Sequence, residues 1–455
     1  MQLKLKDLLA VNPDADLKRI GKYTALYEGG SAFELYKDQF IIKRQLECGG
    51  EGALSGAEHF KERKKRAQYI NRCSGVINWV VSTATKDNPM IATDATEESD
   101  IEFYSNLNKD TDGSGTPFNS LVRLLFTQML VKQYPYLEVR AEGEATKDDW
   151  KLNVIDSSSV LDYDIDDNNE VKWIKTHTRT AYRETTYGAA DGIQNIVTLY
   201  TEDATFGFVF YGKEGEYKDV NGNPLVPEDT VNSNPECSVE SHQFGTNPVF
   251  RGNSTSFHFV MDRLSEPLKA LYNAEIDLAF ALATNCYPQL YLKLEDSNRV
   301  NQIIKDELSI ILLMVTEDIG YVSPGTQAFE SLFKNIDRLK SALTESMRMM
   351  SSEAAELPQA GRLSGEAVKQ MRSPLESMIS ALSYPVQDVL MSGINAIREV
   401  RGDTFNIWIE NFGDVAVEEG EIKELEEELE EEKELEEMVD VSDLQPPIKE
   451  DKEDE

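Results

Sequence analysis

The stretch AAELPQAGRLSGEAVKQMRSPLESM, residues 354–378, lies between two segments with strong helical periodicity. Pro358 and Gly361 interrupt that periodicity, because proline lacks a backbone N–H group and glycine adopts non-helical backbone conformations easily. Ser364 can cap the start of a new helix, and Glu366 suits its first turn. The sequence therefore predicts a helix, a short loop and a second helix, and this order of elements is the main indication of the fold.

Three long helices are predicted in the C-terminal half of the chain. Apolar residues recur every three or four positions over residues 262–288, 329–352 and 364–400, which is the pattern of helices with one buried face. Pro374 and Pro385 lie inside the third helix. Each proline removes a backbone donor and crowds the preceding turn, so we predict a kink or a break there.

A compact insert separates the first two of these helices. Residues 289–326 contain the strand-like stretches LYLKL, IILLMV and GYVSPG, and the stretch NRVNQIIKDELS predicts a short helix. The stretch DTFNIWIENFG, residues 403–413, predicts a strand after the third helix.

The N-terminal half combines helices with a strand-rich region. Residues 57–84 place apolar side chains on one face of a single long helix. This helix contains the dense basic cluster ERKKR, residues 62–66, which is either a solvated face or a contact for nucleic acid or a partner. Thr116 and Pro117 predict the start of a helix over residues 118–135, with Thr116 as the N-cap.

From residue 136 to about residue 262 the apolar pattern changes to a period of two. Residues 169–187 and 195–211 are rich in β-branched and aromatic residues, and asparagine and aspartate mark turns between strands. This region is predicted to be a module of β-hairpins. Together with the helices on either side, it makes the predicted fold class α+β.

Two acidic turns do not fit a calcium-binding loop. A loop that begins at Asp162 would need glycine and glutamate where the chain has Asp167 and Trp173. A loop that begins at Asn108 has the required glycine but ends on Asn119. No metal site is therefore predicted.

The charge of the chain argues against tight binding to nucleic acid. The 455 residues include 82 acidic and 46 basic side chains, which gives a formal net charge of −36. Proteins that bind phosphates tightly cluster lysine and arginine, whereas an acidic surface repels DNA and favours solubility. Residues 418–439 predict a solitary or partly disordered acidic helix with only a short coiled-coil-like seam, and residues 443–455 predict disorder.

No catalytic constellation is found in the sequence. The four cysteines and four histidines show no metal-ligand spacing and no disulfide framework, and the known nucleotide-binding and hydrolase motifs are absent. Asp277 is the acidic residue to test first, because it lies among apolar residues of a predicted helix. The alternative is a solvated carboxylate or a partner for another subunit. We therefore expect no enzymatic activity, no catalytic residue and no cofactor. No apolar run reaches the about 18–20 residues of a membrane span, and the first residues lack the features of a signal peptide.

The order of these elements resembles the portal proteins of tailed bacteriophages. Helix, compact insert, helix, short loop, long kinked helix and strand follow one another from residue 262 onward. The stretch YEGGSAFELY before the helix of residues 57–84 and the turn-rich region of residues 154–184 are similar to the front half of portal subunits. The resemblance covers most of residues 20–412.

The resemblance implies a portal-type subunit with an α/β wing, a two-helix stem, a small clip insert, a tunnel loop and a long kinked helix. The implied division of the chain is an N-terminal arm at 1–56, the wing at 57–262, a first stem helix at 263–288, the clip at 289–326, a second stem helix at 327–351, the tunnel loop at 352–363, the long kinked helix at 364–400, a strand with a reduced crown at 401–417, and an acidic, partly disordered tail at 418–455.

The resemblance also implies a function. Portal subunits form a ring of about twelve copies at one capsid vertex. Double-stranded DNA is packaged and ejected through the ring, which contacts the major capsid protein, the terminase large subunit and a head–tail connector or adaptor protein. The protein would be assembled in the host cytoplasm and located in the virion. The DNA-facing residues implied for the tunnel loop are Glu356, Leu357, Pro358, Gln359, Ala360, Gly361 and Arg362.

Two alternatives remain open. Arg362 either pairs locally with Glu356 or Glu366, or contacts a DNA phosphate. The whole chain could instead be an acidic phage assembly factor or a DNA-mimicking scaffold without a channel, as its charge allows.

Overall fold

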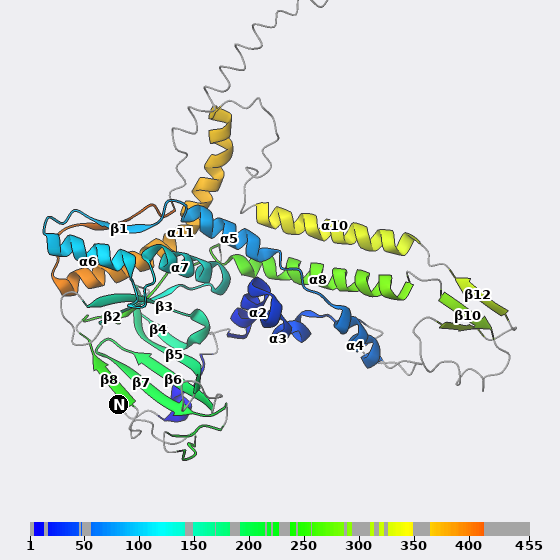
Figure 1. The fold of residues 1–455 in the computed structure, drawn as a ribbon, viewed down its shortest axis with the longest axis horizontal. Helices are drawn as coiled ribbons and strands as arrows, with labels where there is room; N and C mark the ends of the chain where they lie inside the picture. The colour runs from blue at the N-terminus through cyan, green and yellow to red at the C-terminus, as the bar shows by residue number, and fades with distance from the viewer. Residues whose placement is uncertain are drawn as a thin grey trace, which may run out of the picture.

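The structure is a computed structural model with an α+β fold (Figure 1). It describes residues 4–12, 17–44, 47, 56–141, 149–168, 170–182, 192–213, 216–219, 222–226, 237–242, 244–255, 257–285, 289–293, 310–313, 318–322, 326–348 and 365–413.

One hydrophobic core joins helices from both halves of the chain. Its main helices are α2 (Leu17–Glu28), α3 (Gly30–Phe40), α5 (Cys73–Ala84), α7 (Phe118–Lys132), α8 (Val260–Asn285) and α11 (Gly365–Arg401). The helix α7 packs against α2, α5, α8 and α11, and its side chains Leu125, Phe126 and Met129 are fully buried. Such a helix needs apolar residues around most of its circumference, and FNSLVRLLFTQMLVK supplies them.

Two antiparallel sheets form the β-rich part of the protein. The smaller contains β3 (Trp150–Ile155), β2 (Tyr136–Ala141) and β9 (Val249–Arg251), in that order. The larger contains β4 (Val160–Ile165), β5 (Val171–Tyr182), β6 (Gly192–Tyr200), β7 (Ala204–Tyr211) and β8 (Cys237–Ser241), each paired with the next along the chain. A short 3-10 helix, η2 (Ser157–Ser159), precedes β4. The predicted hairpins are thus confirmed.

The N-terminal helix α1 (Leu5–Leu8) covers one face of the larger sheet. Its side chains Leu5 and Leu8 pack among Val197, Leu199 and Phe208, which share a face because side chains alternate along a strand.

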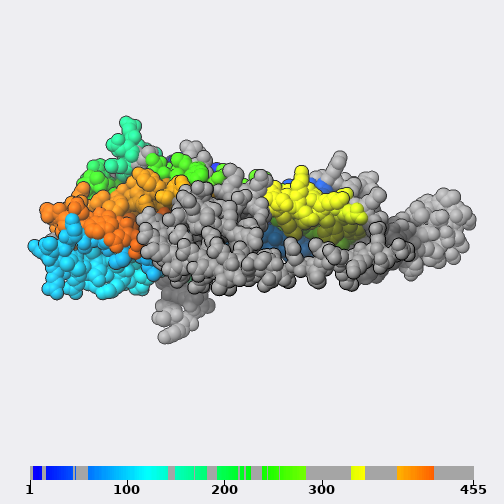
Figure 2. Space-filling model, turned by 90° about the horizontal axis from the view of Figure 1, so that it is seen from above, coloured from blue at the N-terminus to red at the C-terminus, as the bar shows by residue number. Residues whose placement is uncertain are grey.

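Segments from opposite ends of the described chain meet at one end of the molecule. Strand β1 (Met90–Thr93) pairs with β13 (Ile407–Glu410) in a two-stranded antiparallel sheet. The buried guanidinium group of Arg401 donates to Asp100 of α6 (Glu98–Lys109) at 2.8 Å and to Asp403 at 2.8 Å. Figure 2 shows α6 (cyan) beside the orange C-terminal part of the described chain.

An arm of two helices extends away from this body. Helix α8 runs out, and α10 (Thr326–Arg348) lies beside it (Figure 1). At the far end lies a small sheet of β11 (Ile310–Leu313), β10 (Gln289–Lys293) and β12 (Asp318–Val322), in that order. The three strands expected in the insert are therefore present, whereas the short helix predicted at residues 298–309 lies outside the described residues.

The single long helix predicted over residues 57–84 is wrong. The chain forms α4 (Gly56–Arg66) and α5 instead, with residues 67–72 between them in no regular structure. Long-range contacts interrupt the helix here. The hydroxyl of Tyr69 donates to the carbonyl of Leu26 at 2.7 Å, and its ring stacks on that of Phe33 with the ring centroids 4.1 Å apart. The side chain of Asn71 accepts from the N–H of Ser74 at 3.1 Å and thereby starts α5.

The predicted N-cap at Thr116 is also wrong. Helix α7 begins at Phe118, and Pro117 occupies the cap position with an extended backbone. The hydroxyl of Thr116 donates instead to Asp112 at 2.7 Å, within the preceding loop. The N-terminal segment is helical, and the chain turns between α2 and α3 at Gly29 and Gly30, both of which have positive φ.

Helix α11 continues through both of its prolines, so neither of them ends it. Figure 1 shows that the helix changes direction between its first part, drawn in gold, and its second part, drawn in orange. The assignment of this bend to Pro374 or Pro385 stays a prediction. Pro385 is buried in the body, and the carbonyl group of Pro385 lies against Gly252.

We predict that Gly252→Ala destabilises the protein. A Cβ atom at this position would lie 2.7 Å from the carbonyl oxygen of Pro385 and 2.6 Å from the ring of Pro135. Relief of such a clash within a packed core costs about 1–3 kcal/mol, to be measured as the free energy of unfolding in urea. Gly75→Ala is the matched control. It has no atom within 4 Å of the added methyl group and lies within α5, so we expect a gain of about 0.5–1 kcal/mol. Equal effects of the two substitutions would contradict this account.

Candidate functional site

The candidate functional site is the arm formed by α8 and α10. Helix α10 is strongly amphipathic, and its apolar side chains recur every three or four residues along one face. Ile336 and Leu343 are buried, and they belong to the same hydrophobic cluster as Ile276 of α8. Burial of this stripe against α8 gives the arm a core of its own, continuous with that of the body.

The outer face of α10 is charged but not predominantly acidic. Among its described side chains, Glu330 and Asp337 are exposed, and so are Lys334, Arg338 and Lys340. The arm therefore differs from the whole chain, whose net charge is −36. The repulsion of DNA expected from the total charge therefore does not describe this helix face.

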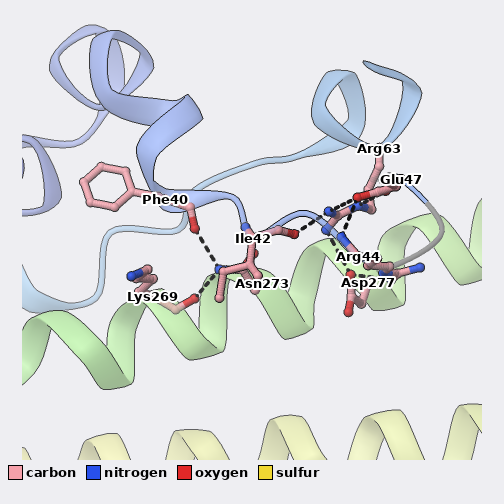
Figure 3. Close-up of polar contacts among 8 residues, drawn as sticks. All are labelled: Phe40, Ile42, Arg44, Glu47, Arg63, Lys269, Asn273 and Asp277. Carbon is pink, nitrogen blue, oxygen red and sulfur yellow. Dashed lines mark hydrogen bonds and ion pairs between the residues drawn. The ribbon is translucent and has the colours of Figure 1, made fainter. Parts of the chain in front are cut away.

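An amide side chain fixes the path of the segment that follows α3 along the side of α8 (Figure 3). Asn273 donates through Nδ2 to the carbonyl of Phe40 at 2.9 Å and to that of Lys269 at 2.8 Å. Its Oδ1 accepts from the N–H of Ile42 at 2.8 Å. One asparagine thus satisfies both the last carbonyl of α3 and an amide of the chain beyond it.

A buried ion cluster lies one turn further along α8 (Figure 3). The guanidinium group of Arg63, whose side chain is 1% exposed, donates to both carboxylate oxygens of Glu47 at 2.7 Å. It also donates to the carbonyl of Ile42 at 2.6 Å and to Asp277 of α8 at 3.2 Å. Arg44 forms a second ion pair with Asp277. The cluster joins α4, residues 42–47 and α8 through charge-assisted hydrogen bonds.

The protonation state of Glu47 matters for this cluster. Burial alone would raise the pKa of Glu47, but the hydrogen bonds from Arg63 and from the N–H of Arg44, with both positive charges, hold the pKa below its usual range. The folded protein therefore binds this proton more weakly than the unfolded chain does. The resulting stabilisation is present above the ordinary pKa of a glutamate and is lost as the pH falls below it.

These contacts correct two expectations from the sequence. Arg63 belongs to the basic cluster ERKKR, yet it is a buried structural residue and not part of a solvated face. Lys64 pairs with Asp38, whereas Lys61, Lys65 and Arg66 are exposed. Asp277 is an ion-pair partner within the chain, with Arg44 and Arg63 as its two cations.

The other predicted site residues fall in different places. Glu356, Leu357, Pro358, Gln359, Ala360, Gly361 and Arg362 lie outside the described residues. Pro374 and Pro385 lie within α11. The acidic turn near Asn108 uses its carboxylates on its own backbone, because Asp110 accepts from the N–H groups of Gly113 and Gly115, both at 2.9 Å. In the described part of the chain, no group of three or more histidine, cysteine, aspartate or glutamate residues could hold a metal ion.

Sequence reasoning missed the partnership of Arg63 with Glu47. The two residues are separated by 16 positions and lie on either side of a glycine-rich stretch, so no helical spacing links them. Arg63 lies four positions before the buried Ala67, on the same side of a helix, and this was the available signal, but a run of six charged residues, 61–66, concealed it. Within the described residues, no helix is both long and apolar enough to cross a membrane.

We predict that Arg63→Met lowers the free energy of unfolding by about 3–5 kcal/mol, because it leaves the buried carboxylate of Glu47 without its partner. Urea unfolding of the purified protein measures the change. Lys65→Met is the control on the same helix, since Lys65 is 76% exposed and its loss should change stability by less than about 0.5 kcal/mol. If Arg63→Met changes stability as little as Lys65→Met, the ion cluster does not hold α4 on α8.

Comparisons with known proteins give only distant likenesses. No protein-family model matches the chain, and no curated protein matches it. The chain is similar to a chain in the neck of an empty GTA particle computed with C6 symmetry, at 11% identity, a TM-score of 0.37, and coverage of 82% of this chain and 86% of the other. It is similar to a chain in the virion of a native gene transfer agent (GTA) particle at 10% identity, a TM-score of 0.34, and coverage of 82% and 86%. It is also similar to a chain in the neck of a native GTA particle computed with C12 symmetry, at 12% identity, a TM-score of 0.33, and coverage of 74% and 79%. TM-scores below 0.5 do not establish a shared fold, so the function proposed below rests on the helices, contacts and charges of this chain itself.

Proposed function

We propose that the protein is a subunit of a ring-shaped portal at one vertex of a phage-like capsid. In this role it forms a channel through which double-stranded DNA is packaged into the head and later ejected, and it has no catalytic activity of its own. The ring contains about twelve copies, in keeping with closed rotational symmetry.

The observation that carries the proposal is the two-helix arm. Helices α8 and α10 extend side by side from the body and end in the small sheet of β10, β11 and β12 (Figure 1). Helix α11 follows and leads back into the body core. This is the order of stem helix, clip, stem helix and long helix that the resemblance to portal proteins implies.

The proposed parts then have distinct partners. The small sheet at the tip of the arm is the clip, which contacts the terminase large subunit during packaging and the head–tail connector or adaptor protein afterwards. The β-rich part is the wing, which faces the major capsid protein. The tunnel loop, residues 352–363, faces the DNA. The protein is assembled in the host cytoplasm and resides in the virion.

The charges of α10 suit a channel that DNA must slide through. Each lysine or arginine that neutralises a phosphate strengthens binding, and sliding must break that contact. The exposed face of α10 mixes Lys334, Arg338 and Lys340 with Glu330 and Asp337. Each carboxylate lies within a few residues of a cation, so attraction of a phosphate to this face is partly offset by repulsion.

We predict that the purified protein forms a closed ring of about twelve subunits with a central hole. Mass photometry gives the number of subunits, and negative-stain electron microscopy shows the hole. A chain that ends at residue 413 is the control, because it retains every described residue of the arm and the body and lacks the acidic tail. A monomer or dimer at micromolar concentration, for both chains, would contradict the portal proposal. Tail-dependent binding to a basic partner in the absence of a ring would favour the acidic assembly factor or DNA mimic.

We predict that glycine substitutions over Leu357–Arg362 leave the ring intact and impair DNA packaging or retention, because the proposed tunnel-loop assignment gives these residues a role toward DNA. The measurement is the amount of nuclease-protected DNA per particle. Lys65→Met serves as the control, since it alters an exposed residue of α4, outside the substituted loop. Rings that package normally with an all-glycine segment would show that the tunnel-loop assignment is wrong.

A further inference from the structure

We propose that His258 is a proton-sensitive latch that holds the second part of α11 against the start of α8. The latch replaces a helical hydrogen bond that Pro385 removes. It depends on the described fold alone, so it stands or falls independently of the proposed channel.

Pro385 leaves one carbonyl group of α11 without its usual partner. In a helix the N–H of residue 385 would donate to the carbonyl of residue 381, and proline has no N–H. Ala381 therefore has a free carbonyl oxygen at the point where the ring of Pro385 crowds the preceding turn. The imidazole Nε2 of His258 lies 3.1 Å from this oxygen.

The other ring nitrogen defines the protonation state of His258. The backbone N–H of Thr255 donates to Nδ1 at 3.0 Å, and the hydroxyl of Thr255 lies 2.9 Å from the same atom. An amide N–H can only donate, so Nδ1 accepts and Nε2 carries the hydrogen. The neutral imidazole with hydrogen on Nε2 therefore satisfies Thr255 and Ala381 together.

The surroundings of His258 favour this neutral form. Burial lowers the pKa of His258, and the positive charge of Arg263 on α8 lowers it further, partly offset by the hydrogen bond to Ala381. Arg263 is held close by, since its guanidinium group donates to the carbonyl of Phe257 at 2.9 Å. From α11, the described group that meets the imidazole is the carbonyl of Ala381, which is uncharged.

Protonation would break the latch on its Thr255 side. A hydrogen on Nδ1 would face the N–H of Thr255, so two donors would meet and the ring would have to turn away. The carbonyl of Ala381 would then lose its donor. Because the folded protein binds the proton more weakly than the unfolded chain, the latch stabilises the fold above the ordinary histidine pKa of about 6.5 and weakens as the pH falls through it.

Close packing makes the latch specific to this place. The carbonyl of Pro385 lies against Gly252, and Gly252 in turn donates to the carbonyl of Pro135 at 2.9 Å. His258 lies six residues beyond Gly252, at the entry to α8. The same short segment thus contacts α11 on both sides of the missing hydrogen bond.

The test is hydrogen–deuterium exchange of the full chain, followed over residues 382–390 and corrected for intrinsic exchange at each pH. We expect His258→Ala to speed exchange in this segment by about tenfold at pH 7.5, which corresponds to one lost hydrogen bond. His258→Gln keeps an N–H donor and should stay within about twofold of the original protein. His242→Ala is the matched control, because its Nε2 also meets a carbonyl, that of Thr201 at 2.9 Å, but far from α11 in the sequence.

Two further measurements distinguish a hydrogen-bonded latch from simple packing of the His258 side chain. Between pH 7.5 and pH 5.5 the original protein should lose about tenfold protection over this segment, and His258→Gln should not. Pro385→Ala restores an N–H for Ala381, so His258→Ala should have less than about a twofold effect in that background. The latch is refuted if His258→Ala leaves α11 exchange unchanged, if His258→Gln keeps the full pH dependence, or if Pro385→Ala does not reduce the effect of His258→Ala.

Discussion

The buried charge of Arg63 is the constraint on which the position of the arm depends. A guanidinium group that is 1% exposed must be matched by carboxylates and carbonyls, and Arg63 finds them on residues 42–47 and on α8. The contacts of Arg63 thereby hold α4, α8 and the residues Ile42 and Glu47 together at one point, and they fix α8 relative to the other two. Helix α10 then takes its place by burying an apolar stripe on α8. The ion cluster of Arg63 fixes the position of α8, and hydrophobic packing against α8 then fixes the position of α10.

Helices α8 and α11 each have one segment inside the body core and one segment that extends out of the body. Their buried segments, around Leu264 in α8 and Ile394 in α11, are fully enclosed by the body core. Their other ends leave the body in different directions (Figure 1). The segment from Gly252 to His258 touches both helices where they share the core. The body core therefore links the arm directly to the bent helix α11.

The elements with strong periodicity were predictable from the sequence, and the contacts between distant segments were not. Residues 262–288 carry an unbroken helical pattern, and α8 covers Val260–Asn285. The division of residues 57–84 into two helices could not be foreseen, because the apolar pattern continues through Tyr69. The helix is interrupted there by long-range contacts, in which the Tyr69 side chain donates to the carbonyl of Leu26 and stacks on Phe33. The apolar neighbours of Asp277 in the sequence made it a candidate functional acid. In the structure it pairs with Arg44 and Arg63, which lie more than two hundred residues away in the sequence. Likewise, Pro385 predicts that the carbonyl of Ala381 lacks its helical donor, but the sequence does not indicate that His258 supplies one.

The pairing of β1 with β13 has a consequence for biosynthesis. Met90 lies opposite Glu410, and Arg401 and Asp403 form buried contacts with Asp100 and Tyr104. About three hundred residues must therefore be translated after β1 before its partner strand exists, and contacts of such long range form late. A chain that terminates before α11 would lack the whole of this seam and expose the part of α7 that packs against α11 and Phe412. The two-stranded sheet and its buried ion pairs thus form only once residues 401–410 have been translated, so this part of the fold distinguishes a chain that reaches β13 from a shorter one.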